Sequence, residues 1–431
     1  MVPIKSRLIF LFLLLNLSPL CLISTRAQSI SADQVFSSLE QSVFQIRIME
    51  EKSGSQVALG TGFLVAEERL ATNYHVVSSA VLEPAKYRVE IDWHEQKIEL
   101  AVVRVDVVND LALLSLPQPL QNSPPIFRLS RNKPKKGELL YSLGNPHDLG
   151  MTIVEGNYNG LVENKYLDRI HFSGAINSGM SGGPTVNRQT QVVGINVASA
   201  GNQVGFLVPV EALAQLLDSG EQPEGEKGIL ASMATQISAV TDGMLQELLD
   251  VDWPREDMGQ AVILGELVNW FDCWGNSDLD KETGFLEIAR GCNSADSIFI
   301  SDAFNSGFME YEFYYFEAED WHPAAFYRHL RANTAGARPG NKAGKHDVGN
   351  FSCVNQILNT DNADNKNPMR RRISYCTRPY KKLPGLYDAF FIGVSVDRDN
   401  RAVMDHYTLA GVTPAISQKF LEKFVGVLAW R

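Results

Sequence analysis

Short apolar segments separated by glycine, asparagine and proline dominate the first half of the chain. Between residues 31 and 217 they cover residues 43–48, 62–65, 87–91, 101–105, 111–114, 139–143 and 192–197. Regular short strands with turn residues between them are typical of a β-sandwich or a β-barrel. We expect a short helix before them, over residues 31–39, and another after them, over residues 210–217.

The pattern changes after residues 219–228, a Gly-, Glu- and Pro-rich stretch that is typical of a linker. Residues 229–431 open with apolar residues at helical spacing, namely Leu230, Met233, Ile237, Met244 and Leu248. A further helix is predicted over residues 261–271. Strands are predicted over residues 285–288, 298–300, 309–316, 387–396 and 402–409.

The last helix of the chain is well marked. Thr413 can cap it, Pro414 suits its first turn, and apolar residues from Ile416 to Leu428 form one face. The second half is therefore predicted to be an α+β domain with an antiparallel sheet. The sequence divides into residues 28–218, a linker at 219–228, and a domain of unknown function at 229–431.

Residues 1–27 have the features of a secretory signal peptide. Lys5 and Arg7 precede an apolar run, and the small residues Thr25 and Ala27 favour cleavage after Ala27. An uncleaved membrane anchor is the alternative, but polar residues and a proline interrupt the run. The mature chain is therefore expected to be periplasmic or secreted, without stable membrane insertion. Its net charge of −11 argues against nucleic acid as a partner.

Four cysteines remain after the predicted signal peptide, and all lie in the second half. They are Cys273, Cys292, Cys353 and Cys376. An even number in an exported chain indicates two disulfides. Of the three possible pairings, Cys273–Cys292 with Cys353–Cys376 is preferred because each bond closes a local loop. A zinc site is the alternative, but the chain has no C-x-x-C spacing.

A glycine-rich run, residues 175–184, reads AINSGMSGGP and lies between two apolar segments. Dense glycines allow tight turns and the close approach of another molecule. Ser181 in such a turn can present its Oγ to a substrate while backbone N–H groups point to the same place. A serine hydrolase also needs a histidine and a carboxylate. His75 follows an apolar strand, and Asp110 directly precedes the apolar run 111–114.

Other interpretations of these residues stay open at this stage. Asp106 could supply the carboxylate, but it lies in a strand with alternating polarity, so Asp110 is preferred. Taken alone, each residue could be structural, and His75 could be a buried histidine at a strand end. Their occurrence together, in the order His75, Asp110 and Ser181, favours a catalytic triad.

The surrounding motifs are specific. They read GTGFLV at 60–65, TNYHVV at 72–77, DLALL at 110–114, GMSGGP at 179–184, VGIN at 193–196 and GFLVP at 205–209. Over about residues 31–217 the chain resembles the HtrA/Deg branch of trypsin-like serine proteases. The resemblance implies two six-stranded β-barrels with the active site in the cleft between them, polypeptide substrates, and no metal or cofactor.

The resemblance also implies a role for each residue. Ser181 is the expected nucleophile, His75 the general base and Asp110 the group that orients the imidazole. The backbone N–H groups of Gly179 and Ser181 are the expected oxyanion hole. Ala175, six residues before the nucleophile, is expected to floor the specificity pocket. Without an acid there, small or apolar residues are favoured at the cleavage site.

Three positions near the nucleophile depart from the family pattern. Ser173 stands where the family often has Asp, Ser178 where Pro is usual, and Met180 where Asn is frequent. These changes bear on how readily the oxyanion loop reaches its active conformation. Residues 229–431 also show no PDZ pattern, although HtrA proteins usually carry a PDZ domain there.

The sequence thus predicts an exported serine endopeptidase whose second domain recruits a protein partner or substrate, or gates the cleft. The alternative is a binding or scaffolding protein that retains the protease fold with weak or conditional activity. Two charged clusters are interpreted as surface features. Asn276, Asp278, Asp280 and Glu287 are taken as an acidic surface loop rather than a calcium site, and residues 370–372 as a solvated basic face.

Overall fold

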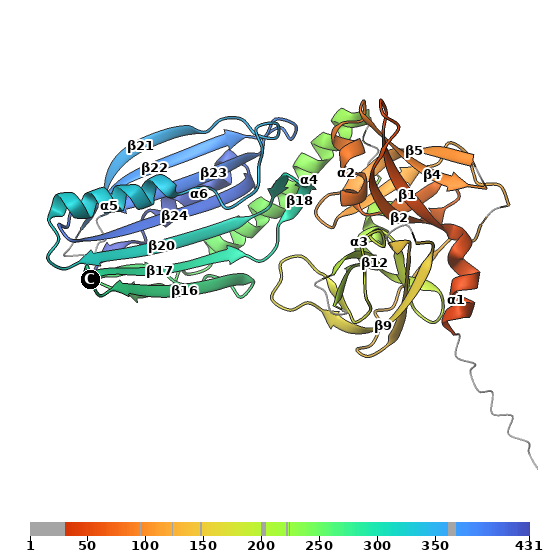
Figure 1. Cartoon of the computed structure of the whole chain (residues 1–431), viewed down its shortest axis with the longest axis horizontal. Helices are drawn as coiled ribbons and strands as arrows, with labels where there is room; N and C mark the ends of the chain where they lie inside the picture. The colour runs from red at the N-terminus through yellow and green to blue at the C-terminus, as the bar shows by residue number, and fades with distance from the viewer. Residues whose placement is uncertain are drawn as a thin grey trace, which may run out of the picture.

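The computed structural model describes residues 31–431 except 95, 123, 147–148, 200–203, 221–222, 224 and 361–367. The predicted signal peptide, residues 1–27, lies outside the described residues. Two bodies are visible in Figure 1, and a long helix, α4, runs along both of them. Among the described residues, no helix combines the length and apolar character needed to cross a bilayer.

The first body begins with helix α1 (Ala32–Leu39) and a short 3-10 turn (Glu40–Ser42). Six antiparallel strands then close a barrel in the order β1-β2-β3-β6-β5-β4. They are β1 (Val43–Glu50), β2 (Gln56–Ala66), β3 (Arg69–Thr72), β4 (Tyr87–Trp93), β5 (Gln96–Asp106) and β6 (Leu111–Ser115). Helix α2 (Tyr74–Leu82) connects β3 to β4 and lies against the barrel.

The second barrel closes because β11 pairs with both β8 and β12. Its strands are β8 (Leu139–Gly144), β9 (Thr152–Leu161), β10 (Ile170–Phe172), β11 (Pro184–Val186), β12 (Gln191–Ser199) and β13 (Gly205–Pro209). The short strand β7 (Arg128–Leu129) adds to β12 in parallel, and helix α3 (Val210–Asp218) follows β13. The two predicted six-stranded β-barrels are thus confirmed.

Helix α4 (Gly225–Asp250) begins inside the stretch predicted as a linker. Beyond it, seven antiparallel strands form one sheet in the order β16-β17-β20-β24-β23-β22-β21. They are β16 (Phe271–Asp280), β17 (Phe285–Ser294), β20 (Met309–Ala318), β21 (Ser352–Thr360), β22 (Met369–Pro379), β23 (Tyr387–Ser395) and β24 (Arg401–Val412). The predicted α+β class of the second half is confirmed.

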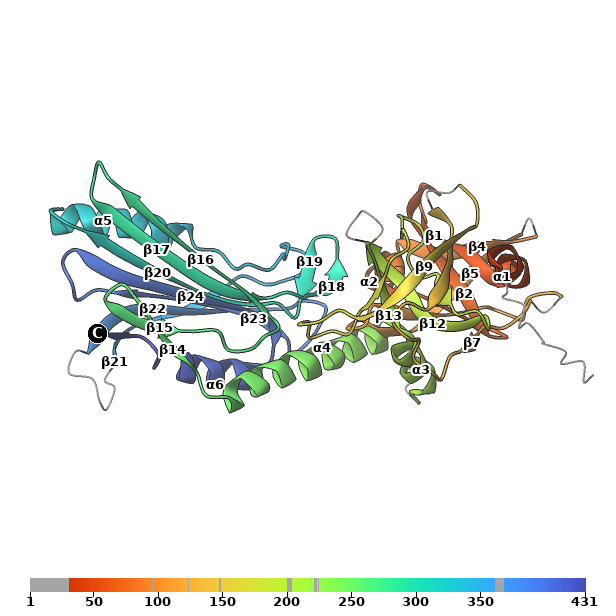
Figure 2. The ribbon, with the colours of Figure 1, turned by 90° about the horizontal axis from the view of Figure 1, so that it is seen from below.

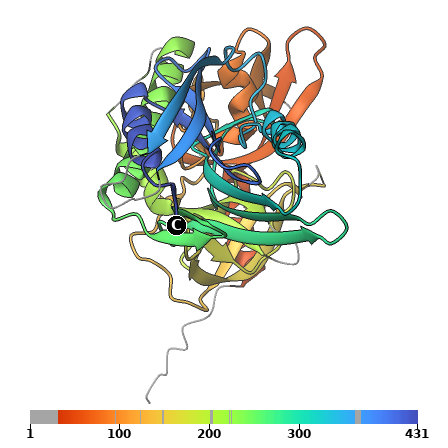
Figure 3. The ribbon, with the colours of Figure 1, turned by 90° about the vertical axis from the view of Figure 1, so that its left-hand side faces the viewer.

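Helices lie on both faces of this sheet. Helices α4 and α6 (Pro414–Phe424) pack on one face, and α5 (Pro323–Gly336) lies on the other (Figure 3). Strand β20 shows why the sheet has two different faces. Met309, Tyr311 and Phe313 alternate with Glu310 and Glu312, and only the first set enters the core shared with α6.

Two small β-structures complete the second body. Strands β14 (Arg255–Met258), β15 (Ala261–Leu264) and β25 (Ala429–Trp430) form a three-stranded sheet. Strands β18 (Ile298–Ser301) and β19 (Phe304–Ser306) form a hairpin. Figure 2 shows this hairpin at the end of the large sheet that faces helix α2.

The helix predicted over residues 261–271 is wrong. Residues Ala261–Leu264 form strand β15, which pairs with β14 through a turn in which Gly259 has a φ of 59°. A short apolar run cannot be assigned to helix or strand by its periodicity alone. The last helix also ends at Phe424, so Leu428 lies beyond it.

Two disulfides join the cysteines as Cys273–Cys292 and Cys353–Cys376, each with a Cα–Cα distance of 4.0 Å. Each pair is directly opposite in register, one on β16 and β17 and the other on β21 and β22. The bonds therefore tie both outer strand pairs of the seven-stranded sheet. The acidic residues near 276–287 lie on the exposed β16–β17 hairpin, so the expected surface loop is instead a pair of strands.

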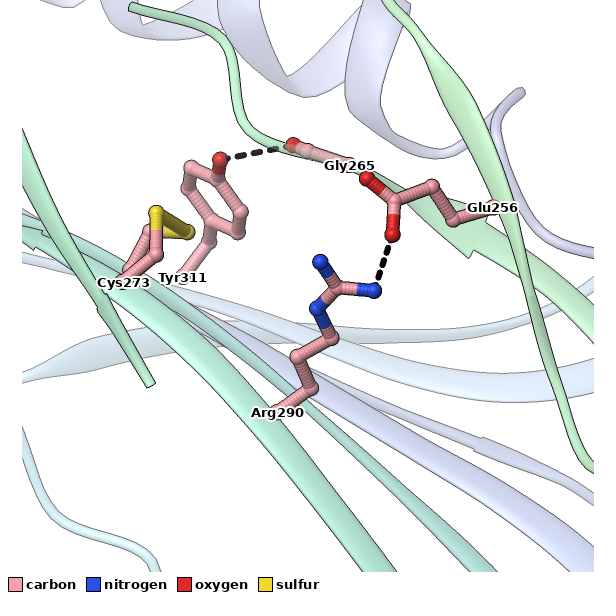
Figure 4. Close-up of a disulfide and its surroundings, with 6 residues drawn as sticks. Glu256, Gly265, Cys273, Arg290 and Tyr311 are labelled. Atoms are coloured by element: carbon pink, nitrogen blue, oxygen red, sulfur yellow. Dashed lines mark hydrogen bonds and ion pairs between the residues drawn. A yellow bond between two sulfur atoms is a disulfide. The ribbon is translucent and has the colours of Figure 1, made fainter. Parts of the chain in front are cut away.

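Figure 4 shows the surroundings of the first disulfide. The hydroxyl of Tyr311 on β20 donates to the carbonyl oxygen of Gly265 at 2.8 Å. Arg290 on β17 forms an ion pair with Glu256 on β14. These contacts fasten the β14–β15 hairpin over the end of the large sheet that carries Cys273 and Cys292.

Candidate active site

Asp110 occupies the turn between β5 and β6 in a conformation that few residues adopt. Its φ is 63°, in the left-handed region where Asp and Asn are the most frequent non-glycine residues. Its carbonyl oxygen accepts hydrogen bonds from Tyr74 N (3.2 Å) and from Asn73 Nδ2 (2.8 Å). The turn is therefore fixed to the residues that precede the histidine.

His75 lies in the first turn of α2, and both of its nitrogen contacts go to one carboxylate. His75 Nδ1 is 2.7 Å from Asp110 Oδ2, and the His75 backbone N–H donates to Asp110 Oδ1 at 2.8 Å. This two-point contact fixes the imidazole orientation. Because an ionised carboxylate only accepts hydrogen bonds, the neutral imidazole carries its proton on Nδ1, and Nε2 is the acceptor. Asp106 is held elsewhere, since its carboxylate accepts the backbone and side-chain N–H groups of Asn109.

The electrostatics of His75 follow from its surroundings. Burial lowers its pKa by disfavouring the charged imidazolium, but the charge and hydrogen bond of Asp110 raise it, as does the charge of Asp302. The raising contributions prevail, so the pKa of His75 is above its ordinary value. The site thus stabilises the protonated imidazole.

Ser181 lies in the loop between β10 and β11. Its carbonyl oxygen accepts from the Thr61 backbone N–H at 2.8 Å, and its hydroxyl donates to the carbonyl oxygen of Val197 at 3.3 Å. A Cβ on the following residue, Gly182, would lie 2.9 Å from Asn73 N. Gly182 therefore lets the serine loop lie directly against the segment that leads into His75.

Gly179 takes a φ of 94°, which a glycine adopts without strain. The Thr61 hydroxyl donates to the Gly179 carbonyl oxygen at 2.6 Å and so holds that peptide group. Within the described part of the chain, no protein oxygen accepts from the backbone N–H groups of Gly179 and Ser181. The two predicted oxyanion donors are thus free of competing acceptors there.

Asn196 is a residue of the site that sequence analysis noted only as part of a motif. Its amide nitrogen donates to the carbonyl oxygens of Leu143 (3.0 Å) and Met180 (3.1 Å). Its Oδ1 accepts from the Ser142 and Thr185 hydroxyls at 2.8 and 2.7 Å. A buried amide with all four hydrogen bonds made fixes the serine loop in place. The signal in the sequence is a lone polar residue within the apolar run 192–197.

Met180, Ser173 and Ala175, which sequence analysis singled out near the nucleophile, lie in different surroundings. Met180 is fully buried in a cluster with Phe172 and Ile176. The Ser173 hydroxyl accepts from the Asn157 backbone N–H at 2.8 Å. Ala175, the predicted pocket floor, is half-buried beside Ile176.

Residues 60–195 match the model of the trypsin-like peptidase domain. A probable periplasmic DegP-like serine endoprotease from Brucella suis is 29% identical over 223 residues, which are 48% of this chain and 42% of that protein. Serine protease HTRA1B from Danio rerio is 31% identical over 224 residues, which are 48% of this chain and 45% of that protein.

A solved serine endoprotease from Yersinia pestis aligns with a TM-score of 0.37 and 23% identity over 44% of this chain and 66% of that one. The chain spans less than half the length of the two curated relatives. The family match lies within the two barrels and contains His75, Asp110 and Ser181, while Asn196 and Val197 directly follow it. Residues 60–195 therefore form a trypsin-like peptidase domain, and the amino-terminal half of the chain is similar to HtrA-type serine proteases.

Proposed function

We propose that this protein is a periplasmic or secreted serine endopeptidase that cleaves polypeptides through an acyl-enzyme. The observation that carries the proposal is the two-point contact between Asp110 and His75, with the Ser181 loop held against the same segment. The curated relatives named above are serine proteases, and the name of one includes the word periplasmic. The predicted signal peptide supports the same location.

The reaction follows from the roles of three side chains. The Ser181 hydroxyl turns from the Val197 carbonyl toward His75 Nε2 and attacks the scissile carbonyl carbon while Nε2 takes its proton. The resulting oxyanion accepts from Gly179 N and Ser181 N, and removal of one such donor costs roughly 3 kcal/mol. His75 then protonates the leaving amine. Water hydrolyses the acyl-enzyme by the same route and releases Ser181.

The uncharged residue at the expected floor of the specificity pocket supports a preference for small or apolar residues. Ala175 provides no charge at the expected pocket floor, and a Cβ on Gly205 would lie 2.7 Å from Ile176 Cγ1. The strand that begins at Gly205 therefore lies close against this segment. An apolar pocket separates similar side chains by only about 1–3 kcal/mol, so cleavage should be loosely selective.

Labelling with a fluorophosphonate probe tests the proposal. The full chain should form one covalent adduct, and peptide mapping should place it on Ser181. Ser181→Ala should give no adduct and no cleavage of casein, while keeping the wild-type circular dichroism spectrum. An unlabelled wild-type chain, or an adduct on another serine, would disprove the assignment.

A second candidate function is a binding protein with the protease fold. It is favoured by the Ser181 hydroxyl, which is hydrogen-bonded to Val197 rather than to His75. Under this hypothesis, Ser181→Ala should bind an unfolded polypeptide as wild type does, and wild type should leave that polypeptide intact. The labelling experiment separates the two functions directly.

A further inference from the structure

The second domain contacts the protease domain on the face that carries His75 and Asp110. Helix α2, helix α4 and the β18–β19 hairpin share one buried apolar cluster, which includes Tyr74, Val77, Met233, Ile237, Ile300 and Phe304. Figures 1 and 2 both show the hairpin and the start of α4 beside α2. The two domains are therefore joined by a continuous core, and not only by a linker.

On the histidine side, the β18–β19 hairpin lies against the first turn of α2. The buried Tyr74 hydroxyl donates to the carbonyl oxygen of Ile300 at 3.0 Å. The Phe299 ring meets the Tyr74 ring edge-on, with centroids 6.4 Å apart. The Phe299 ring also lies edge-on to the His75 ring, with centroids 6.1 Å apart and an interplanar angle of 79°. Phe299 and Ile300, more than 220 positions later in the sequence, thus contact the predicted general base and the residue before it.

On the aspartate side, helix α4 holds the end of β5. Gln236 Nε2 donates to the Val105 carbonyl oxygen at 2.8 Å, and its Oε1 accepts from Val107 N at 2.9 Å. These two bonds satisfy the backbone just before the turn that contains Asp110. An amide that bonds the backbone in both directions continues the strand pairing and so fixes the position of the turn.

The second barrel is held from the same domain. Tyr166, in the loop between β9 and β10, packs on Trp270 with ring centroids 5.2 Å apart. Asp296, just before β18, accepts from the Leu167 backbone N–H at 3.4 Å. The second domain therefore contacts both barrels, and it ties the histidine helix and the aspartate turn to one support.

We infer that the second domain positions the His75–Asp110 pair, through the bond between Ile300 and Tyr74 on the histidine side and through Gln236 on the aspartate side. This inference rests on the proposed peptidase function. The physical reason is that proton transfer from Ser181 requires the imidazole within hydrogen-bonding distance and correctly oriented. A displacement of about 1 Å can lower the rate roughly 100-fold. The hairpin and α4 remove that freedom.

Two substitutions in the full-length chain test the inference. Tyr74→Phe removes only the hydroxyl that reaches Ile300, and Gln236→Leu removes the bonds to Val105 and Val107. Each should lower kcat by roughly 10- to 100-fold with KM changed less than about threefold. The rate of fluorophosphonate labelling should fall in parallel, because it depends on the same general base.

Each variant has a matched control. Tyr311→Phe removes another buried hydroxyl that donates to a backbone carbonyl, 2.8 Å away on Gly265, inside the second domain. Gln246→Leu changes a glutamine on the same helix whose side chain donates to Asp250 in the next turn. Both controls should keep wild-type kcat, and thermal unfolding should show how much each pair differs in stability.

The outcomes separate this inference from the proposed function. If wild type forms no adduct at Ser181, the peptidase function itself is wrong. If wild type reacts and Tyr74→Phe and Gln236→Leu keep its kcat and its pH profile, the positioning role is wrong and the function stands. Loss of kcat in the controls to the same extent would show a general stability effect and would also overturn the inference.

The hairpin also contributes charge to the site. Asp302, in the β18–β19 turn, lines a cavity together with Ser78 and Ser79 of helix α2, one turn after His75. The charges of Asp110 and of Asp302 both raise the pKa of His75. The general base acts when neutral, so kcat/KM should fall as the pH drops through this raised pKa. Asp302→Asn should therefore move the acid limb of the kcat/KM profile to lower pH.

Asp347→Asn is the control for this change. Asp347 lines the same cavity between the domains as Asp302, and its carboxylate accepts from the Gly344 backbone N–H. Its profile should coincide with that of wild type. An acid limb that stays in place or moves to higher pH in Asp302→Asn would contradict an electrostatic contribution from the second domain.

Discussion

Replacing Asp110 by asparagine is expected to lower kcat about 10⁴-fold while the fold stays intact. Asparagine tolerates the left-handed backbone at this position, so the turn between β5 and β6 should survive. Its amide would donate to His75 Nδ1, which forces the proton onto Nε2. A protonated Nε2 cannot accept the Ser181 proton, so the general base is lost. Steady-state cleavage of a peptide substrate measures the effect.

Asp106→Asn is the matched control, because Asp106 lies in the same connection but bonds only Asn109 in the contacts described here. It should keep kcat within a few-fold of wild type. Retention of more than a tenth of wild-type activity in Asp110→Asn would show that Asp110 does not orient the base. Equal losses of kcat in both variants would indicate damage to the turn, and not a change in which nitrogen of His75 carries the proton.

The largest expected effect on stability comes from a buried ion pair in the second domain. Arg371 on β22 and Asp405 on β24 are both fully buried and hydrogen-bonded to each other. Asp405→Leu removes one partner and leaves the guanidinium buried without its counter-charge. Such a loss typically costs about 3–5 kcal/mol. Equilibrium urea unfolding, followed by tryptophan fluorescence, measures the change.

The double variant Arg371→Met with Asp405→Leu should recover most of that loss, since apolar side chains of similar volume can replace a buried pair. Arg401→Met tests a more exposed pair on the same sheet, Arg401–Glu317 at 3.0 Å, and should cost less than about 1 kcal/mol. A single Asp405→Leu variant as stable as wild type would mean that the unpaired Arg371 guanidinium carries no such cost.

The protease domain was predictable because its signals are local. The glycines around Ser181 and the apolar run after Asp110 each mark a candidate catalytic residue by its immediate neighbours in the sequence. The short apolar strands that end at turn residues predicted a β-sandwich or a β-barrel. The resemblance to the HtrA/Deg proteases then specified two six-stranded barrels. The preference for Asp110 over Asp106 rested on the run 111–114, and in the structure Asp110 is the residue that contacts His75.

The contacts of the second domain were not predictable from local signals. Phe299 and Gln236 lie in ordinary apolar and helical patterns, and only the tertiary fold brings them to His75 and to the end of β5. The interpretation of residues 370–372 as a solvated basic face is wrong for Arg371. Period-2 alternation in β22 places Arg371 on the buried face with Met369 and Ile373.

Strand β16 is an outer strand whose position cannot be chosen by burial. Every residue after Phe271 in it is exposed, so a shift of one residue against β17 would move no large apolar surface into or out of water. The Cys273–Cys292 bond supplies the missing specification, because it joins residues that are directly opposite in the ladder. A covalent bond here selects the alignment that hydrophobic patterning leaves undetermined.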